Sequence, residues 1–174
     1  IPRDRIIGLP RSENFWGPAG ATGPCGPCSE LNYDRGAEYG CGEPDCAPGC
    51  ERCERFLEFW NLVFMEFDLG ADGTLTPLPK PVIDTGLGLE RTAAIQQDVI
   101  TVYETDGFQA LMDWIEAESG VAWTSSEKAT KAHRIMADHG RGMTFLVADG
   151  VLPSNEGRGY VLRRVIRRAV QQAR

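Results

Sequence analysis

The chain has 174 residues, of which 42% are hydrophobic and 25% charged, and this composition is ordinary for a globular protein with a buried core. No apolar run approaches the roughly 20 residues of a membrane-spanning helix, and no signal peptide is visible. The net charge of −7 argues against a general coat for nucleic acid. We expect a cytoplasmic protein without membrane contact, and Ile1 indicates an excised piece of a longer chain.

The first half of the chain is rich in glycine, proline and cysteine and predicts strands joined by turns. Residues 29–34 alternate in the manner of a strand. Residues 57–67 are the clearest strand, and because both faces are largely apolar, we expect this strand to be central and covered on both sides. The pair Asp72-Gly73 predicts a hairpin turn, after which residues 75–83 return antiparallel, with pairing limited by prolines.

The cysteines fall into two groups. Cys25 and Cys28 form a CxxC pair, a spacing found in metal and redox sites, although a structural role is preferred here. The other four lie together in a loop rich in glycine and proline: Cys41, Cys46, Cys50 and Cys53. Their spacing suits tetrahedral zinc, and a reducing compartment disfavours disulfides. We expect one structural Zn²⁺ in this loop, while exchange with Cys25 or Cys28 stays open as an alternative.

Residues 84–91, Asp-Thr-Gly-Leu-Gly-Leu-Glu-Arg, predict the end of a strand, a glycine-rich turn and the start of a helix. The two glycines allow the backbone to approach a ligand closely, and the planar guanidinium of Arg91 suits a phosphate or a flat base. Together with the carboxylate of Asp84, they suit a site that holds a small amine beside a nucleotide. A competing role for Asp84 is to cap the helix that follows.

The second half of the chain predicts helices. Residues 87–97 and 105–119 are the first two, and the second of these carries one apolar stripe: Phe108, Leu111, Met112 and Ile115. Ser125 or Ser126 caps a third helix that runs at least to Ala137. Residues 153–155 form a loop, and residues 159–173 form a final helix with an apolar stripe opposite its arginines.

Basic residues are concentrated at the end of the chain. From residue 157 onward there is no acidic residue, and the arginines are Arg158, Arg163, Arg164, Arg167, Arg168 and Arg174. A basic stripe on an acidic protein favours docking of one nucleic-acid feature in a defined orientation. A solvated helix face is the alternative.

Five sequence blocks resemble the class II aminoacyl-tRNA synthetases, and among them the alanyl-tRNA synthetases. The blocks span nearly the whole chain and follow the order found in that family. Residues 77–91 resemble the family's motif 3, and four further blocks resemble the same family: residues 14–16, 23–30, 59–67 and 148–164. The resemblance implies an α+β fold. Residues 1–97, with the Cys-rich loop 41–53, would be part of a class II antiparallel catalytic sheet, and residues 98–174 a helical tRNA-recognition region.

The family resemblance implies an alanine–tRNA ligase, which adenylates alanine with ATP and Mg²⁺ and then transfers it to tRNA. Asp84 would hold the ammonium group of alanine, and Gly86 would border its methyl group. Trp16 and Val63 would form the walls of the pocket, although either could be core, and for Val63 the sequence alone favours core. Asn61 would lie near the carboxylate or the amine of the amino acid.

The same resemblance assigns ATP to Gly88 and Arg91, with Asp84 and Arg91 as the catalytic pair. In the family, the asparagine matching Asn155 reads the acceptor-stem minor groove of tRNA(Ala) near a G·U pair, where an amide oxygen can accept from the guanine amino group. The neighbouring arginines would bind phosphates: Arg158, Arg163, Arg164, Arg167 and Arg168.

Motifs 1 and 2 of the family would lie upstream of Ile1, so we expect this piece alone to be inactive and to act with the remainder of the synthetase chain. Editing is not encoded, because the two histidines, His133 and His139, lack the His/Cys cluster that an editing site needs. One rival function is a stand-alone zinc-stabilised RNA-binding module without catalysis. Another is a related ligase that charges a small amine acceptor other than tRNA.

Overall fold

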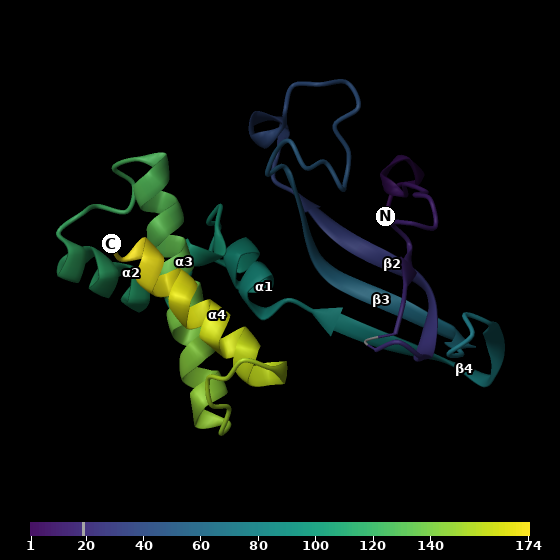
Figure 1. The fold of residues 1–174 in the computed structure, drawn as a ribbon. Helices are drawn as coiled ribbons and strands as arrows, with labels where there is room; N and C mark the ends of the chain where they lie inside the picture. The colour runs from purple at the N-terminus through teal and green to yellow at the C-terminus, as the bar shows by residue number, and fades with distance from the viewer. Residues whose placement is uncertain (19) are drawn as a thin grey trace. The chain divides into compact units, whose positions relative to one another are not determined.

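The computed structural model describes residues 1–18 and 20–174, which form two compact units, Ile1–Ile95 and Gln96–Arg174. The first unit is built on an antiparallel sheet and the second is helical, as Figure 1 shows. The α+β fold class expected from the sequence is therefore confirmed. Among the described residues, no helix combines the length and the apolar character needed to cross a membrane.

The sheet of the first unit has four strands in the order β1-β2-β3-β4, and every neighbouring pair is antiparallel. The strands are β1 Phe15–Trp16, β2 Gly23–Asp34, β3 Phe56–Leu69 and β4 Leu75–Leu87. Two short 3₁₀ turns, η1 Arg3–Arg5 and η2 Ala37–Tyr39, precede β1 and follow β2. The strands expected at residues 29–34, 57–67 and 75–83 are all present, and each extends beyond the expected range.

The hairpin between β3 and β4 forms where the Asp72-Gly73 pair predicts it. Gly73 has a φ of +80°, a left-handed conformation that glycine adopts without strain. The Asp72 carboxylate accepts a hydrogen bond of 3.0 Å from the amide of Thr74, which closes the turn. The expected hairpin is therefore confirmed.

Prolines interrupt the pairing of β4 with β3, as expected. Phe67 pairs with Pro77 and Met65 pairs with Val82, so residues 78–81 of β4 lie opposite Glu66 alone. Proline has no N–H to donate to the ladder, and the strand therefore bulges over this segment. Regular pairing resumes at Val82 and carries the following residues into register with the middle of β3.

β3 occupies the interior of the sheet, but the expectation that both of its faces are covered is wrong. Val63 and Met65 are buried on one face, whereas Trp60 and Phe64 on the other are 36% and 38% exposed. The apolar character of both faces correctly placed β3 between two strands. The sequence pattern of one strand does not show whether another layer of the protein covers each face of the sheet.

The expectation that the strand ends at Asp84 is wrong. β4 continues to Leu87, and Asp84 lies within the paired strand. The helix α1, Leu89–Gln96, begins after Gly88, whose carbonyl accepts from the amide of Thr92 at 2.9 Å. Asp84 is therefore too far from the helix start to serve as its N-cap, which removes the competing role for this residue.

The second unit contains η3 Val102–Glu104, α2 Asp106–Ser119, α3 Glu127–Ala148 and α4 Gly157–Gln172 (Figure 1). Ser126 caps α3 by accepting from the amide of Ala129 at 3.1 Å, so one of the two expected capping residues is confirmed. The apolar stripe of α2 packs against α3 and forms the core: Phe108, Met112, Ile115 and Ala137, with Leu111 partly buried beside them.

Gly26 is a position where β2 and β3 approach too closely for a side chain. A Cβ there would overlap the carbonyl group of Phe64 and lie 3.0 Å from the amide nitrogen of Glu66. We expect Gly26→Ala to lower the free energy of unfolding by about 1–3 kcal/mol, because backbone must move to make room. The measurement is urea-induced unfolding of the chain.

The matched control is Gly142→Ala in α3, where an added Cβ meets nothing within 4 Å. There the same substitution should stabilise by about 0.5–1 kcal/mol, because alanine restricts the unfolded chain and favours helix. Equal midpoints for Gly26→Ala and the unsubstituted chain would contradict the close approach of β2 to β3.

Candidate functional site

The register of β3 with its neighbours gathers the expected amino-acid site. Asn61 lies opposite Glu30 of β2 and opposite Gly86 of β4, and Val63 lies opposite Asp84. Residues that face each other across an antiparallel ladder present their side chains to the same side of the sheet. Asn61, Val63, Asp84 and Gly86, named separately from the sequence, therefore share one face.

Asn61 is the most constrained member of this group. Its Nδ2 donates a hydrogen bond of 2.9 Å to Oε1 of Glu30. Its Oδ1 is buried and has no hydrogen-bond partner among the described residues. Buried side-chain oxygens are nearly always paired, so an orphaned acceptor here points to a bound donor as its partner.

Glu30 was not singled out from the sequence, although it lies in one of the blocks, residues 23–30, that resemble the family. Burial raises the pKa of its carboxyl group, and the negative charges of Glu58 and Glu13 raise it further, while Arg91 acts in the opposite direction. The surroundings of Asn61 are therefore rich in negative charge. Such a field favours a cationic ligand group.

Gly86 and Asp84 lie on an open part of this face. A Cβ at Gly86 would meet nothing within 4 Å, so neither packing nor backbone conformation of the chain requires glycine there. Asp84 is exposed, and its Oδ1 accepts from the amide of Thr85 at 2.9 Å. The two residues border an open surface, whereas the family resemblance implies a pocket there.

Trp16 is less closely associated with this group. It lies on β1 opposite Gly26 of β2 and is 37% exposed. β1 pairs with β2, so Trp16 is separated by one strand from Asn61 and Val63 on β3. Trp16 is therefore not a direct neighbour of Asn61 or Val63 in the sheet.

Arg91 lies in the first turns of α1 and is anchored to β3. Its Nη1 donates to the backbone oxygen of Glu58 at 2.7 Å and approaches the Glu58 carboxylate at 3.2 Å. A Cβ at Gly88 would meet the side chain of Arg91 at 3.4 Å, a van der Waals contact, so this arrangement does not require glycine there. Glu58 was also missed from the sequence, where it is one charge at the start of an apolar strand.

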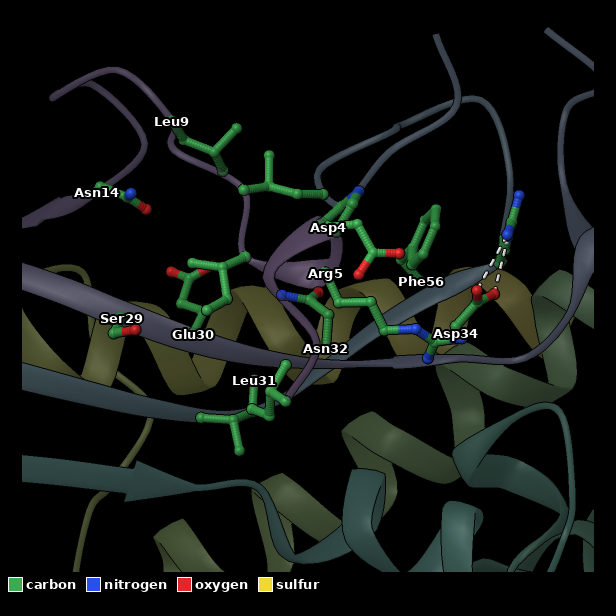
Figure 2. A pocket seen from close by; sticks show the side chains of 15 residues that line it. Asp4, Arg5, Leu9, Asn14, Ser29, Glu30, Leu31, Asn32, Asp34 and Phe56 are labelled. Atoms are coloured by element: carbon green, nitrogen blue, oxygen red, sulfur yellow. Dashed lines mark hydrogen bonds and ion pairs between the residues drawn. The ribbon is translucent and has the colours of Figure 1, made fainter. Parts of the chain in front are cut away.

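A pocket of about 440 Å³ adjoins Glu30 on β2 (Figure 2). Polar side chains from β2, among them Asn32 and Asp34, line one wall, and the segment containing Arg5 and Leu9 lines another. Figure 2 shows Glu30 at one end of the pocket and the Asp34 ion pair at the other. The alternation of residues 29–34 was visible in the sequence, but the partner segment that encloses the pocket was not.

The four cysteines of the loop come together as expected for a metal site. Their Sγ atoms all lie within 4.8 Å of one another, with Cys41 and Cys50 at 3.8 Å and Cys46 and Cys53 at 3.6 Å. Zn–S bonds of about 2.3 Å in a tetrahedron separate the sulfur atoms by about 3.8 Å. The donor set and its spacing therefore fit zinc.

Cys25 and Cys28 do not belong to this cluster. Cys25 is fully buried in β2, and Cys28 lies opposite Val63 in the sheet. Within the cluster, the amide and the guanidinium of Arg52 lower the pKa of Cys50 to about 7. The thiolate that binds metal is therefore readily formed at that position.

The Cys-rich loop is closed at its base by an ion pair. Arg55 donates to both carboxylate oxygens of Asp34, at 2.8 and 3.0 Å, and holds the pKa of Asp34 below its ordinary value. The amide of Arg35 also donates to the backbone oxygen of Arg55 at 2.9 Å. These bonds join the end of β2 to the start of β3 and hold the two ends of the Cys-rich loop together.

In the second unit, α4 exposes the arginines expected from the sequence: Arg158, Arg163, Arg164, Arg167 and Arg168. The loop before α4 crosses the helix at Gly159, where a Cβ would overlap Ser154 and the carbonyl of Leu152. This crossing brings Asn155 to Arg163, whose Nη1 donates to the Asn155 side-chain oxygen. That oxygen, expected to accept from a guanine, is thus engaged by Arg163.

Comparison with known proteins agrees with these features. All of residues 1–174 match the family model described as class II (A) tRNA synthetases. Among curated proteins, the chain is 54% identical over its whole length to the alanine–tRNA ligase of Desulfosudis oleivorans. It is also 54% identical to that of Oleidesulfovibrio alaskensis and 50% identical to that of Clostridioides difficile, each over its whole length.

The chain spans 20% of the length of each of these relatives. The family match covers both units, from the sheet with the Asn61 face to the helix with the exposed arginines. The motif resemblance read from the sequence and the whole-chain match agree, and the chain belongs to the family of class II (A) tRNA synthetases.

Proposed function

We propose that the protein carrying this chain is an alanine–tRNA ligase, in which the first unit holds the amino acid and the second meets the tRNA. The observation that carries the proposal is the orphaned Oδ1 of Asn61, which shares a face with Asp84 and with the open position at Gly86. The ammonium group of a small amino acid can donate to the Asn61 oxygen and pair with the Asp84 carboxylate, and the short side chain of the amino acid fits beside Gly86.

In this proposal the carboxylate of Asp84 pairs with the ammonium group of alanine, and Val63 forms the floor beneath it. Gly86 leaves space for the methyl group, and Trp16 bounds the site from the flank. The alanine carboxylate attacks the α-phosphorus of ATP and pyrophosphate leaves. The terminal hydroxyl of the tRNA then attacks the carbonyl carbon of the aminoacyl adenylate, so that an ester bond forms, the anhydride bond breaks and AMP leaves.

We assign the nucleotide to Arg91 and Gly88. The guanidinium, anchored on the backbone of β3, would stabilise phosphate charge or stack on adenine. Mg²⁺ usually binds through one or two carboxylates together with substrate phosphates, and Glu58 beside Arg91 is a suitable carboxylate. When bound, Mg²⁺ would neutralise phosphate charge as pyrophosphate departs.

The first test is Asp84→Asn in the complete synthetase polypeptide, measured by alanine-dependent ATP–pyrophosphate exchange. We expect kcat/KM for alanine to fall by at least about a hundredfold, because the ammonium group loses its charged partner. The matched control is Asp68→Asn, an exposed position of β3, which should leave exchange unchanged. Near-normal exchange by Asp84→Asn would withdraw the assignment of Asp84, whereas no exchange by the unsubstituted polypeptide would favour a module without catalysis.

We further propose that α4 and the loop before it bind the acceptor stem of tRNA(Ala). The exposed arginines suit phosphates, and Asn155 suits a base edge in the wide minor groove of an A-form helix. Because Arg163 engages the side-chain oxygen of Asn155, RNA would either displace Arg163 or meet the amide nitrogen. The family resemblance, together with this exposed basic face, supports the assignment.

The second test is the double substitution Arg167→Ala with Arg168→Ala, measured by binding of an acceptor-stem RNA at several salt concentrations. We expect weaker binding and a salt dependence whose slope is reduced by about one unit for each lost phosphate contact. The control is Arg3→Ala, an exposed arginine of the first unit. An unchanged slope would mean that this part of α4 is only a solvated face.

We propose that Cys41, Cys46, Cys50 and Cys53 hold one structural Zn²⁺. The cation would cross-link the loop between β2 and β3 above the Asp34–Arg55 ion pair and would take no part in catalysis. The four thiolates fit because cytoplasmic thiols stay reduced. The loop would then be fixed at its base by the ion pair and at its tip by the metal.

The third test is elemental analysis of the chain purified under reducing conditions, where we expect about one zinc per molecule. Cys46→Ser should release the metal, whereas Cys28→Ser on β2 should retain it. Purified chain without zinc would contradict the site. Loss of zinc from Cys28→Ser would instead show that Cys28 exchanges into the ligand set.

A further inference from the structure

The orientation of the Asn61 side-chain amide is decided by Glu30. An ionised carboxylate can only accept hydrogen bonds, so the nitrogen end of the amide must face Glu30, where the bond measures 2.9 Å. The oxygen end is then turned away from Glu30. It is buried and has no partner among the described residues.

The charges around Asn61 agree with this orientation. Burial and the negative charges of Glu58 and Glu13 raise the pKa of Glu30, and the opposing charge, Arg91, is itself paired with Glu58 at 3.2 Å. Asp84 adds a further carboxylate on the face that carries Asn61 and Gly86. A ligand carboxylate entering here would meet like charge, whereas an ammonium group would meet acceptors and negative charge.

We infer that Glu30 is a positioning residue that holds the Asn61 amide with its oxygen toward the bound amino acid, so that Asn61 accepts from the ammonium group. The sequence left the carboxylate and the amine of the substrate as equal partners for Asn61. This inference rests on the proposed amino-acid site and names which end of the substrate that residue recognises.

Without the Glu30 carboxylate, the amide has no reason to keep this orientation. A glutamine at position 30 offers both a donor and an acceptor, so the Asn61 amide can turn over and present its nitrogen to the ammonium group. An aspartate keeps the charge but is shorter by one methylene, so it no longer reaches Nδ2. The two variants separate the hydrogen bond from the charge.

The experiment uses the complete synthetase polypeptide with Glu30→Gln, Glu30→Asp and the control Glu66→Gln, an exposed glutamate of β3. Alanine-dependent ATP–pyrophosphate exchange gives kcat and the KM values for alanine and ATP. Inhibition is measured with L-alaninol, which has the ammonium group but no carboxylate, and with L-lactate, which has the carboxylate but no ammonium group. Thermal unfolding of each variant reports its stability.

Both Glu30 variants should raise KM for alanine about tenfold to a hundredfold, with kcat and KM for ATP nearly unchanged, as expected for loss of one charge-assisted hydrogen bond. Inhibition by L-alaninol should weaken by the same factor, while inhibition by L-lactate should stay the same. In NMR spectra of the free protein, the side-chain NH₂ signals of Asn61 should shift in both variants and not in Glu66→Gln.

Three results would overturn the inference. Equal weakening of L-lactate would show that Asn61 serves the carboxylate, and normal KM in Glu30→Asp would show that only the charge matters. A rise in KM for ATP would place Glu30 at the nucleotide. Absence of alanine-dependent exchange in the unsubstituted protein is a separate outcome that overturns the proposed function itself, and the inference with it.

Discussion

The antiparallel register of β3 is the constraint on which the first unit depends. Its pairing with β2 sets Asn61 opposite Glu30, and its pairing with β4 sets Asn61 opposite Gly86 and Val63 opposite Asp84. A shift of one residue would turn these side chains to the other face of the sheet. Glu30, the unpaired Oδ1 of Asn61 and Gly86 lie close together because β3 pairs with β2 on one side and with β4 on the other.

Local sequence features maintain this register from both sides. On β2, Gly26 permits a backbone approach that no other residue tolerates. On β4, the segment 78–81, which contains prolines, bulges out of the ladder, and regular pairing resumes at Val82. Where β2 ends and β3 begins, the ion pair of Asp34 with Arg55 closes the Cys-rich loop. None of these three features contacts Asn61 directly, but each helps to fix the register that places Asn61 opposite Glu30 and Gly86.

The second unit follows a different physical logic. Its core is the apolar stripe of α2 against α3, which includes Phe108 and Met112, and its outer surface is the arginine face of α4. In α4 the apolar side chains that pack in the core and the exposed arginines lie on different faces, because residues three or four apart share a face of a helix. The proposed RNA contact needs charge at the surface more than an enclosed pocket, and the exposed arginines of α4 supply that charge.

The sequence by itself determined the hairpin at Asp72-Gly73, the α2 stripe and the zinc-compatible cysteine spacing, because these depend on local periodicity, turn chemistry and short separations, and its family resemblance implied the fold class. The tertiary structure alone decided that Asp84 stays within β4, that one face of β3 is exposed, and that Glu30 orients Asn61. The first and third arise from pairing between segments distant in the sequence, and the second depends on whether another layer covers the sheet; the pattern of a single strand carries no record of either.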